Sequence, residues 1–473
     1  MNRRHARRTL AVLSVLALGG CATFSEDGGF GSVQAEVKAR TGKDPVWVKT
    51  QAQRDSVDRR VAELLAGPLD VEAAVEIALL NNRGLQAAYA ELGIAEAEFV
   101  LAGRLPNPRL SYMNASHPAV GGREYKIEQA LTINLFSLVT MPLASELQAR
   151  NVQRVQRGVA LEVLRLASET RKAWYAAIAA EESLRYQRQV SEIAEAAAEL
   201  ARRMARVGNF NRLAQAREQS FYADAALGVA RAEQARIAMR ERLVRLLGLW
   251  GEQAQLKLPE RLPELPRTAQ DLPEIEQRAM RERLDLQAAR FETEALAKNL
   301  GLTRTTRFIN ALEFGPVRVL EGRKSEQWKK GYELSVELPL FDWGGARVAR
   351  AESIYMQAVE RVAETAVNAL GSARGYAAYR TGWEVARHYR DELVPIRKRI
   401  ADENLLRYNG MLIGVFELLA DARAQVAAVN GAIEALRDFW LAEADLQMAL
   451  IGKPAPGALP RTATAPAASG GGH

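Results

Sequence analysis

Alternation of apolar and polar residues marks a pair of β-strands in the first half of the chain. From Tyr125 to Leu135, apolar side chains fall on one face and polar side chains on the other, with Gln129 as the exception. This period of two residues is that of a strand. An extended stretch at 109–116 precedes it, and residues 117–122, which include a proline and two glycines, predict the turn. The pattern therefore predicts a hairpin.

The second half of the chain repeats this arrangement. An extended stretch begins near Phe308 and Leu312, a loop is expected around Gly315-Pro316 and Gly322, and the returning strand alternates from Tyr332 to Leu338. Strands of about 10 to 11 residues with one apolar and one polar face are typical of transmembrane barrels. The alternative is a half-buried sheet that packs on helices inside an ordinary domain.

Four strands are too few to close a barrel. No stretch after Cys21 offers the roughly 18 apolar residues that a membrane-spanning helix needs, so the strands are the candidate spanning elements. An open strand edge in lipid leaves backbone groups unsatisfied at several kcal/mol each, so the chain is expected to oligomerise. Two copies give eight strands with a filled interior, whereas three give twelve strands and a water-filled lumen. The polar inner faces favour three copies.

Residues before the first hairpin have a helical period. A helix starts near Leu69, breaks at 81–84, and resumes until about Arg104, where Pro106-Asn107-Pro108 stops it. We expect a corresponding helix before the second hairpin, because the two halves of the sequence resemble each other.

Each hairpin is followed by a very long helical run. Residues from Met141 to about Val207, and from Trp343 to about Asn409, are dominated by Ala, Arg, Glu and Leu, which favour helix. At 1.5 Å per residue, each run is roughly 100 Å long. Such helices expose too much surface to stand alone and are expected to pack as coiled coils. A preceding helix of about 20 residues and a following helix of about 40, stacked end to end, could flank the long helix.

The two halves are copies of one unit. Four short matches occur in the same order at an offset of about 202 residues: Leu85–Ala88 with Leu286–Ala289, Tyr175–Ala177 with Tyr376–Ala378, Gly208 with Gly410, and Gly248 with Gly452. The predicted repeats are residues 69–260 and 261–453. Residues 21–68 are interpreted as a tether, and residues 454–473, rich in Ala, Pro, Gly and Thr, as a disordered tail.

Residues 1–20 have the features of a secretory signal peptide. A basic start precedes the apolar run Leu10–Leu18, and Leu18-Gly19-Gly20-Cys21 follows. Cys21 is the only cysteine and lies where a bacterial lipoprotein signal is cleaved, so it resembles a lipidation site. Ala22 is typical of sorting to the outer membrane. The alternative is an unpaired buried cysteine, but neither an amphipathic helix nor a partner surrounds it.

The net charge does not indicate a nucleic-acid partner. The chain has 64 basic and 57 acidic residues, but four arginines lie in the predicted signal peptide, which leaves 60 against 57. The remaining charges are interspersed along helices rather than gathered in one basic stripe.

No arrangement of residues predicts catalysis, a metal site or a cofactor. The four histidines are scattered, and a single cysteine cannot form a zinc cluster. The Gly-Lys pairs at 42–43 and 452–453 lack the upstream glycine of a phosphate loop. No G-x-S-x-G sequence suggests a hydrolase. The protein is therefore not expected to be an enzyme.

Four segments resemble the TolC-like outer membrane efflux proteins. They are Arg104–Pro108 (RLPNP), Leu338–Gly345 (LPLFDWGG), Arg206–Leu213 (RVGNFNRL) and Tyr408–Arg423 (YNGMLIGVFELLADAR). The similarity covers roughly residues 69–452. It implies a mainly α fold with transmembrane β-strands. Three copies would form a twelve-stranded barrel in the outer membrane, continued by a long periplasmic α-helical barrel.

The resemblance also implies a function and partners. Members of the family are passive conduits for substrates that an inner-membrane transporter delivers through a periplasmic adaptor. Lipidated members exist, which agrees with Cys21. The alternative is a lipid-anchored periplasmic adaptor or scaffolding protein. Adaptors of that kind have one hairpin of helices between small β domains, whereas this chain has two.

By the same resemblance, Gly208 and Gly410 would lie at the helix-to-helix turns where the adaptor docks. Glycine suits a reversal that needs a positive φ or a close approach of the backbone, although a plain helix C-cap is the alternative. Glu417 and Asp421 follow on one helix face, and threefold symmetry would turn them into two acidic rings that favour cations. The family places its aspartate about nine residues after the glycine, whereas Asp421 is eleven away, so a solvated helix face is the alternative.

Overall fold

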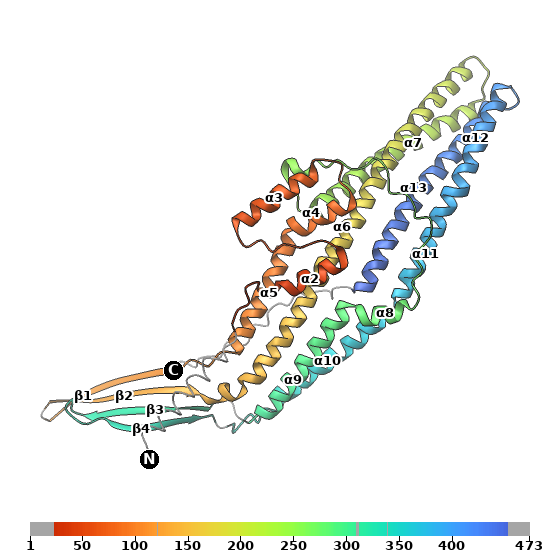
Figure 1. The fold of residues 1–473 in the computed structure, drawn as a ribbon. Helices are drawn as coiled ribbons and strands as arrows, with labels where there is room; N and C mark the ends of the chain where they lie inside the picture. The colour runs from red at the N-terminus through yellow and green to blue at the C-terminus, as the bar shows by residue number, and fades with distance from the viewer. Residues whose placement is uncertain (1–22, 121, 309–311, 338, 453–473) are drawn as a thin grey trace. The chain divides into compact units, whose positions relative to one another are not determined.

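The computed structural model describes residues 23–120, 122–308, 312–337 and 339–452 (Figure 1). The predicted signal peptide, Cys21 and the tail at 454–473 lie outside these residues. As far as it is described, the chain divides into two compact units, each with segments from both halves of the sequence. The first comprises Met1–Val33, Tyr89–Val159 and Leu286–Ala366, and the second comprises Gln34–Ala88, Ala160–Asp285 and Val367–His473.

The first unit contains one antiparallel sheet of four strands in the order β1-β2-β3-β4. The strands are β1 (Arg109–Ala119), β2 (Gly122–Asn134), β3 (Leu312–Gly322) and β4 (Lys329–Val336). Each half of the sequence supplies one hairpin, and β2 pairs with β3 to join them, with Ile127 opposite Leu320. The prediction of two hairpins is confirmed.

The loop predicted around Gly315-Pro316 is wrong, because both residues lie inside β3. The connection to β4 lies instead at 323–328. A Cβ atom on Gly315 would collide with the carbonyl oxygen of Leu131, so only glycine lets β3 approach β2 here. Pro316 has no N–H to donate, and the pairing with β2 is interrupted between Ala130 and Ile133.

The apolar face of the sheet is exposed in the single chain. Leu131 and Ile133 on β2 are exposed, whereas Thr132 between them is buried. On β4, Tyr332 and Leu334 are exposed as well. Successive residues point to opposite faces of a strand, so the exposed apolar side chains follow the alternation in the sequence.

Helices make up most of the rest of the chain. Those named here for the first time are α4 (Val71–Asn81), α5 (Arg83–Ala102), α7 (Arg212–Leu247), α8 (Ile275–Glu282), α9 (Leu284–Thr306) and α13 (Val415–Ile451). The break predicted at 81–84 falls between α4 and α5. In the described part of the chain, no helix is both long and apolar enough to cross a membrane.

The first long run is a single helix, α6 (Leu135–Arg206), of 72 residues. The predicted start at Met141-Pro142 is wrong, because the helix begins directly after β2. The side chain of Asn134 accepts a hydrogen bond from the backbone N–H of Ser137 at 2.8 Å and so caps the first turn. This cap sets the start, and Pro142 lies inside the helix.

The second long run is interrupted, so the single helix predicted from Trp343 to Asn409 is wrong. It consists of α10 (Gly345–Leu370), α11 (Ser372–His388), a π-helical turn at Tyr389–Leu393, and α12 (Val394–Asn409). Pro395 has no N–H with which to bond back to the carbonyl of Asp391, and the π turn lies directly before it.

The ends of α7 and α13 are held in equivalent ways within the second unit. The side-chain amide of Asn81, at the end of α4, donates to the carbonyl oxygen of Gly248 at 2.8 Å. Arg283 lies 202 residues later, directly before α9, and donates to the carbonyl of Ala449 at 3.1 Å. The duplication therefore extends to individual contacts.

The segment predicted as a tether contains two helices that the prediction missed, α2 (Phe30–Thr41) and α3 (Gln51–Leu65). Thr50 and Gln53 form a capping box at the start of α3, and Val57 and Val61 are buried along one face. The capping sequence was visible in the chain, but the short apolar stripe gives a weak helical signal.

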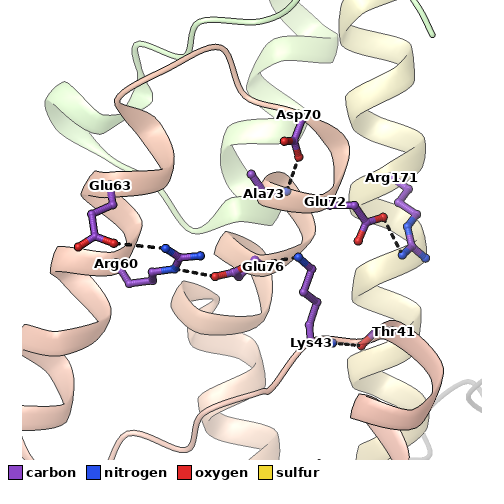
Figure 2. Close-up of polar contacts among 9 residues, drawn as sticks. All are labelled: Thr41, Lys43, Arg60, Glu63, Asp70, Glu72, Ala73, Glu76 and Arg171. Carbon is purple, nitrogen blue, oxygen red and sulfur yellow. Dashed lines mark hydrogen bonds and ion pairs between the residues drawn. The ribbon is translucent and has the colours of Figure 1, made fainter. Parts of the chain in front are cut away.

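Polar contacts bind this segment to α4 in the second unit (Figure 2). Glu76 accepts a hydrogen bond from Arg60 at 2.7 Å and pairs with Lys43 at 3.2 Å. Burial raises the pKa of Glu76, but the hydrogen bonds from Arg60 and Lys43 outweigh it and hold the pKa below its usual value. On α4 itself, Glu72 pairs with Arg171 on α6 at 3.3 Å. The segment is therefore part of the folded body.

Candidate functional site at the helix-to-helix turns

The turn from α6 to α7 reverses the chain at Gly208. Gly208 has a φ of 80°, in the left-handed region that glycine adopts without strain. Its N–H donates to Ala205 at 3.2 Å, and the N–H of Asn209 donates to Met204 at 3.0 Å. This is the paired bonding of a glycine-ended helix. The side chain of Asn211 then accepts from Ala214 and caps α7.

The turn from α12 to α13 has the same bonding but not the same residue type. Gly410 has a φ of −80°, so a positive φ is not the reason for glycine at this position. Met411 takes the left-handed position, with a φ of 58°. The N–H groups of Met411 and Leu412 donate to Tyr408 at 2.9 Å and Arg407 at 2.8 Å. Met411 therefore corresponds to Gly208, and a search for paired glycines misses it by one residue.

Apolar side chains project from both turns. Val207 and Leu213 are exposed beside Gly208, and Met411 and Leu412 are exposed in the second turn. A Cβ atom on Gly208 would meet nothing within 4 Å. Both turns are therefore surfaces to which a partner has access.

The first turn is also strongly basic. Glu199 pairs with Arg202 at 3.0 Å and with Arg203 at 2.8 Å, and the hydrogen bond from Arg203 lowers the pKa of Glu199. Arg212 and Arg217 on α7 are exposed and have no ion-pair partner among the described residues. The surface around this turn can therefore attract acidic groups.

The two candidate acids on α13 differ in surroundings. Glu417 lies in the first turn of α13, is exposed, and has no side-chain hydrogen bond or ion pair within the residues that the structure describes. Asp421 is half-buried and accepts a hydrogen bond from the side-chain amide of Asn404 on α12. In this part of the chain, Glu417 is thus the better placed of the two to face water.

Solved structures of outer-membrane channels match this arrangement. The outer-membrane channel OprN is 18% identical with a TM-score of 0.68, and the match covers 89% of this chain and 96% of OprN. The MtrE outer membrane channel of Neisseria gonorrhoeae in its open state is 20% identical with a TM-score of 0.66, over 81% of this chain and 89% of that one. The CmeC outer membrane channel of Campylobacter jejuni is 15% identical with a TM-score of 0.66, over 87% and 90%. The chain has the TolC-like outer membrane channel fold. No family model and no curated protein matches the sequence.

The predicted site residues lie at or directly after the two helix-to-helix turns. Gly208 lies in one helix-to-helix turn, and Gly410 ends the helix that leads into the other. Glu417 and Asp421 follow on α13, as the sequence indicated. In the part of the chain that the structure describes, no three or more His, Cys, Asp or Glu side chains are grouped so that they could hold a metal ion.

One polar contact between the two halves of the TolC-like fold was not predicted. Glu218 on α7 is 3% exposed and accepts a hydrogen bond from the guanidinium of Arg423 on α13 at 2.5 Å. The same guanidinium lies 4.2 Å from the ring centre of Phe221. Sequence alone gives no signal for this pair, because α13 is what buries Glu218.

Proposed function

We propose that the protein is the outer membrane channel of a tripartite efflux system. In this proposal it is a passive conduit for substrates that an inner-membrane transporter delivers through a periplasmic adaptor. The observation that carries the proposal is the open four-stranded sheet with an exposed apolar face, in a chain of TolC-like fold. In this role the protein does not alter the substrate chemically.

The sheet argues for a trimer in the outer membrane. Within the described residues, β1 and β4 each have a strand on one side only. In lipid, unpaired edges are too costly to persist, whereas three copies would seal them in a ring of twelve strands around water. Exposed Leu334 on β4 would then face lipid.

Two adjacent substitutions test the membrane face. Leu334→Arg puts a charge on the face proposed to contact lipid, whereas Ser335→Arg puts it on the opposite face of the same strand. A charge in lipid costs about 2–4 kcal/mol near the bilayer centre. We expect Leu334→Arg to reduce the heat-sensitive trimer in outer-membrane fractions and Ser335→Arg to leave it unchanged. Equal effects, or a soluble monomer in the wild type, would contradict the proposal.

We also propose that the turns at Gly208 and Gly410 dock the adaptor. Because Gly410 has an ordinary φ, Gly410→Leu adds bulk without backbone strain. We expect this variant and Gly208→Leu to form trimers that crosslink poorly to the adaptor. Unchanged crosslinking in both variants would rule out docking at these glycines.

Lipid anchoring through Cys21 is a further part of the proposal, supported by the lipoprotein-like sequence before it. Wild-type cells grown with labelled palmitate should yield labelled protein, and Cys21→Ser should yield none. An equally labelled Cys21→Ser variant would exclude this residue as the attachment site.

Glu417 and Asp421 are proposed as acidic rings at the narrow end of the conduit. Such rings would attract cations by charge in a confined aqueous path. Reconstituted channels carrying Glu417→Ala together with Asp421→Ala should lose cation preference and block by multivalent cations. The two single variants would separate their contributions, and unchanged current and block in the double variant would refute the constriction.

A further inference from the structure

The two faces of the four-stranded sheet differ in charge. The register and the alternation of side chains place every carboxylate of the described strands on the face opposite Leu334: Glu124, Glu128, Glu313, Glu321 and Glu333. On that face Glu313 pairs with Arg109 at 3.5 Å. Glu321 pairs there with Lys329 at 3.0 Å. Cations and carboxylates on this face therefore partly neutralise one another.

The apolar face, which includes Leu334, has two cations in one row and no carboxylate within the described strands. In the register, Arg318 on β3 lies between Gln129 on β2 and Lys330 on β4. The Nε of Arg318 donates a hydrogen bond to the side-chain oxygen of Gln129 at 2.6 Å, which accounts for the exception to the alternation in β2. Both cations are exposed and lack an ion-pair partner among the described residues. We call Gln129, Arg318 and Lys330 the basic row.

The basic row forms one side of a groove on this face. The groove has a volume of about 530 Å³. Its other side consists of apolar side chains in the next row of the sheet: Leu110, Leu131, Pro316 and Tyr332. A molecule in the groove would contact cations on one side and hydrocarbon on the other. These are the two contacts that a lipid with an anionic headgroup makes with a protein.

The basic row lies near the end of the sheet where the hairpins turn. Lys330 is the second residue of β4 and follows the connection at 323–328. At the opposite end of the sheet, β2 runs directly into α6. The ring centre of Trp328 lies 4.9 Å from the guanidinium of Arg318, and tryptophan is enriched where a membrane meets water. Since the helices are proposed to extend into the periplasm, the row would lie at the headgroups of the outer leaflet.

Assembly into a ring would not bring a carboxylate of the strands to the basic row. In a ring of three copies, β4 of one copy would lie beside β1 of the next. The side chains of β1 on this face are uncharged: Leu110, Tyr112, Asn114, Ser116 and Pro118. Glu326, in the connection before β4, forms no ion pair with Arg318 or Lys330 in the described part of the chain. A neutralising group therefore has to come from outside the protein.

We propose that the basic row binds the phosphate group of an outer-leaflet lipid whose acyl chains lie in the groove. Phosphate is the matching group, because a guanidinium can donate two parallel hydrogen bonds to its oxygens. Gln129 occupies the Nε of Arg318, which leaves both Nη groups to donate to the phosphate. Lys330 adds a second positive charge, and the stems of both cations can lie along the apolar side of the groove. The inference rests on the proposed function, because it requires this face to contact lipid.

Binding of a phosphate-bearing lipid to the purified full-length trimer tests the inference. The probe is lipid A, an acylated sugar that carries phosphate groups, and native mass spectrometry in detergent counts the bound molecules. Arg318→Gln with Lys330→Gln should weaken binding by on the order of tenfold or more, because both charge-assisted contacts are lost. Arg109→Gln with Lys329→Gln is the matched control, since it removes two cations from the opposite face of the same sheet. It should bind lipid A as the wild type does.

Two further measurements make the result specific. The single variants Arg318→Gln and Lys330→Gln should each lose part of the affinity, which keeps the test valid if the double variant does not assemble. Excess inorganic phosphate, compared with chloride at equal ionic strength, should leave the lipid bound, because phosphate does not occupy the apolar side of the groove. Complete displacement by phosphate would reveal a site for a free anion and would overturn the assignment to lipid.

The outcomes separate this inference from the proposed function. If the trimer is present in outer-membrane fractions but the double variant binds lipid A as tightly as the wild type, the inference is overturned and the proposed function stands. Equal loss of binding in the double variant and in its control would also overturn the inference, because it would reflect total charge alone. If Leu334→Arg and Ser335→Arg reduce the trimer equally, this face does not contact lipid and both are overturned.

Discussion

The side-chain amide of Asn81 donates to the carbonyl oxygen of Gly248 at 2.8 Å, and the two backbones nearly touch. A Cβ atom on Gly248 would lie 2.9 Å from the carbonyl oxygen of Asn81. Gly248 also has a φ of 67°. One residue thus ends α7, reverses the chain and allows α4 to reach the open carbonyls of α7.

Gly248→Ala should destabilise the protein for two reasons. Left-handed backbone costs a residue with a Cβ atom about 1–2 kcal/mol, and here the Cβ would also press on the backbone of Asn81. Gly251→Ala is the matched control, because Gly251 has a φ of 60° but nothing within 4 Å of its Cβ position. We expect a clearly larger fall in melting temperature for Gly248→Ala, measured by circular dichroism. Equal falls in melting temperature would show that contact between the added Cβ atom and the backbone of Asn81 does not destabilise the protein.

Arg283→Ala should be among the most damaging single changes in the second unit. Arg283 and Asp285 form an ion pair at 2.5 Å with side chains only 5% and 10% exposed. Removing one partner of a buried pair costs about 3–5 kcal/mol, because the other charge stays buried. Arg278→Ala breaks an exposed pair with Glu282 and should cost about 0–1 kcal/mol. Chemical denaturation of both variants measures the difference, and similar losses would contradict the prediction.

Met411→Gly should leave stability unchanged or raise it by up to about 1 kcal/mol. The substitution removes left-handed strain at a side chain that is 93% exposed, so little packing is lost. The greater freedom of glycine in the unfolded chain offsets part of the gain. Gly410→Ala, at a φ of −80°, is the control and should be close to neutral. A marked loss of melting temperature for Met411→Gly would mean that the methionine makes stabilising contacts.

Glu443→Gln should stabilise the protein at neutral pH but not in acid. Burial raises the pKa of Glu443, and nearby Arg171 offsets this only in part. A carboxyl with a raised pKa holds its proton more tightly when folded, so its favourable contribution is present below about pH 4 and is lost as pH rises. The melting temperatures of variant and wild type should therefore agree near pH 4 and diverge towards pH 7. Glu434→Gln, at an exposed position on the same helix, is the control and should not change the melting temperature at either pH. A melting temperature for Glu443→Gln that exceeds the wild type more at pH 4 than at pH 7 would contradict the prediction.

The strands were predictable because alternation is a local property. Tyr125 to Asn134 alternates in sequence and forms part of β2. The hairpin reverses after Ala119, inside the turn predicted at 117–122, but residues 117–119 of that prediction still belong to β1. The predictions of where helices begin and end were less accurate. Asn134 starts α6 well before the proline that the prediction used, and Pro395 follows a π turn where a straight helix was expected. The repeat boundaries at 260 and 261 stay a prediction.

By itself, the sequence determined the kinds of element, their order and the duplication, because each depends on periodicity along one segment. The tertiary structure alone decided which residues have unusual surroundings. Gly315 is fixed by the approach of β2, and Glu218 is an ordinary surface acid until α13 brings Arg423 to it. Likewise, Met411 rather than Gly410 is left-handed because the bonding of the whole turn sets the backbone there. The surroundings of Gly315 and Glu218 come from contacts between distant segments, which a local pattern does not encode, whereas those of Met411 come from backbone hydrogen bonds within its own turn.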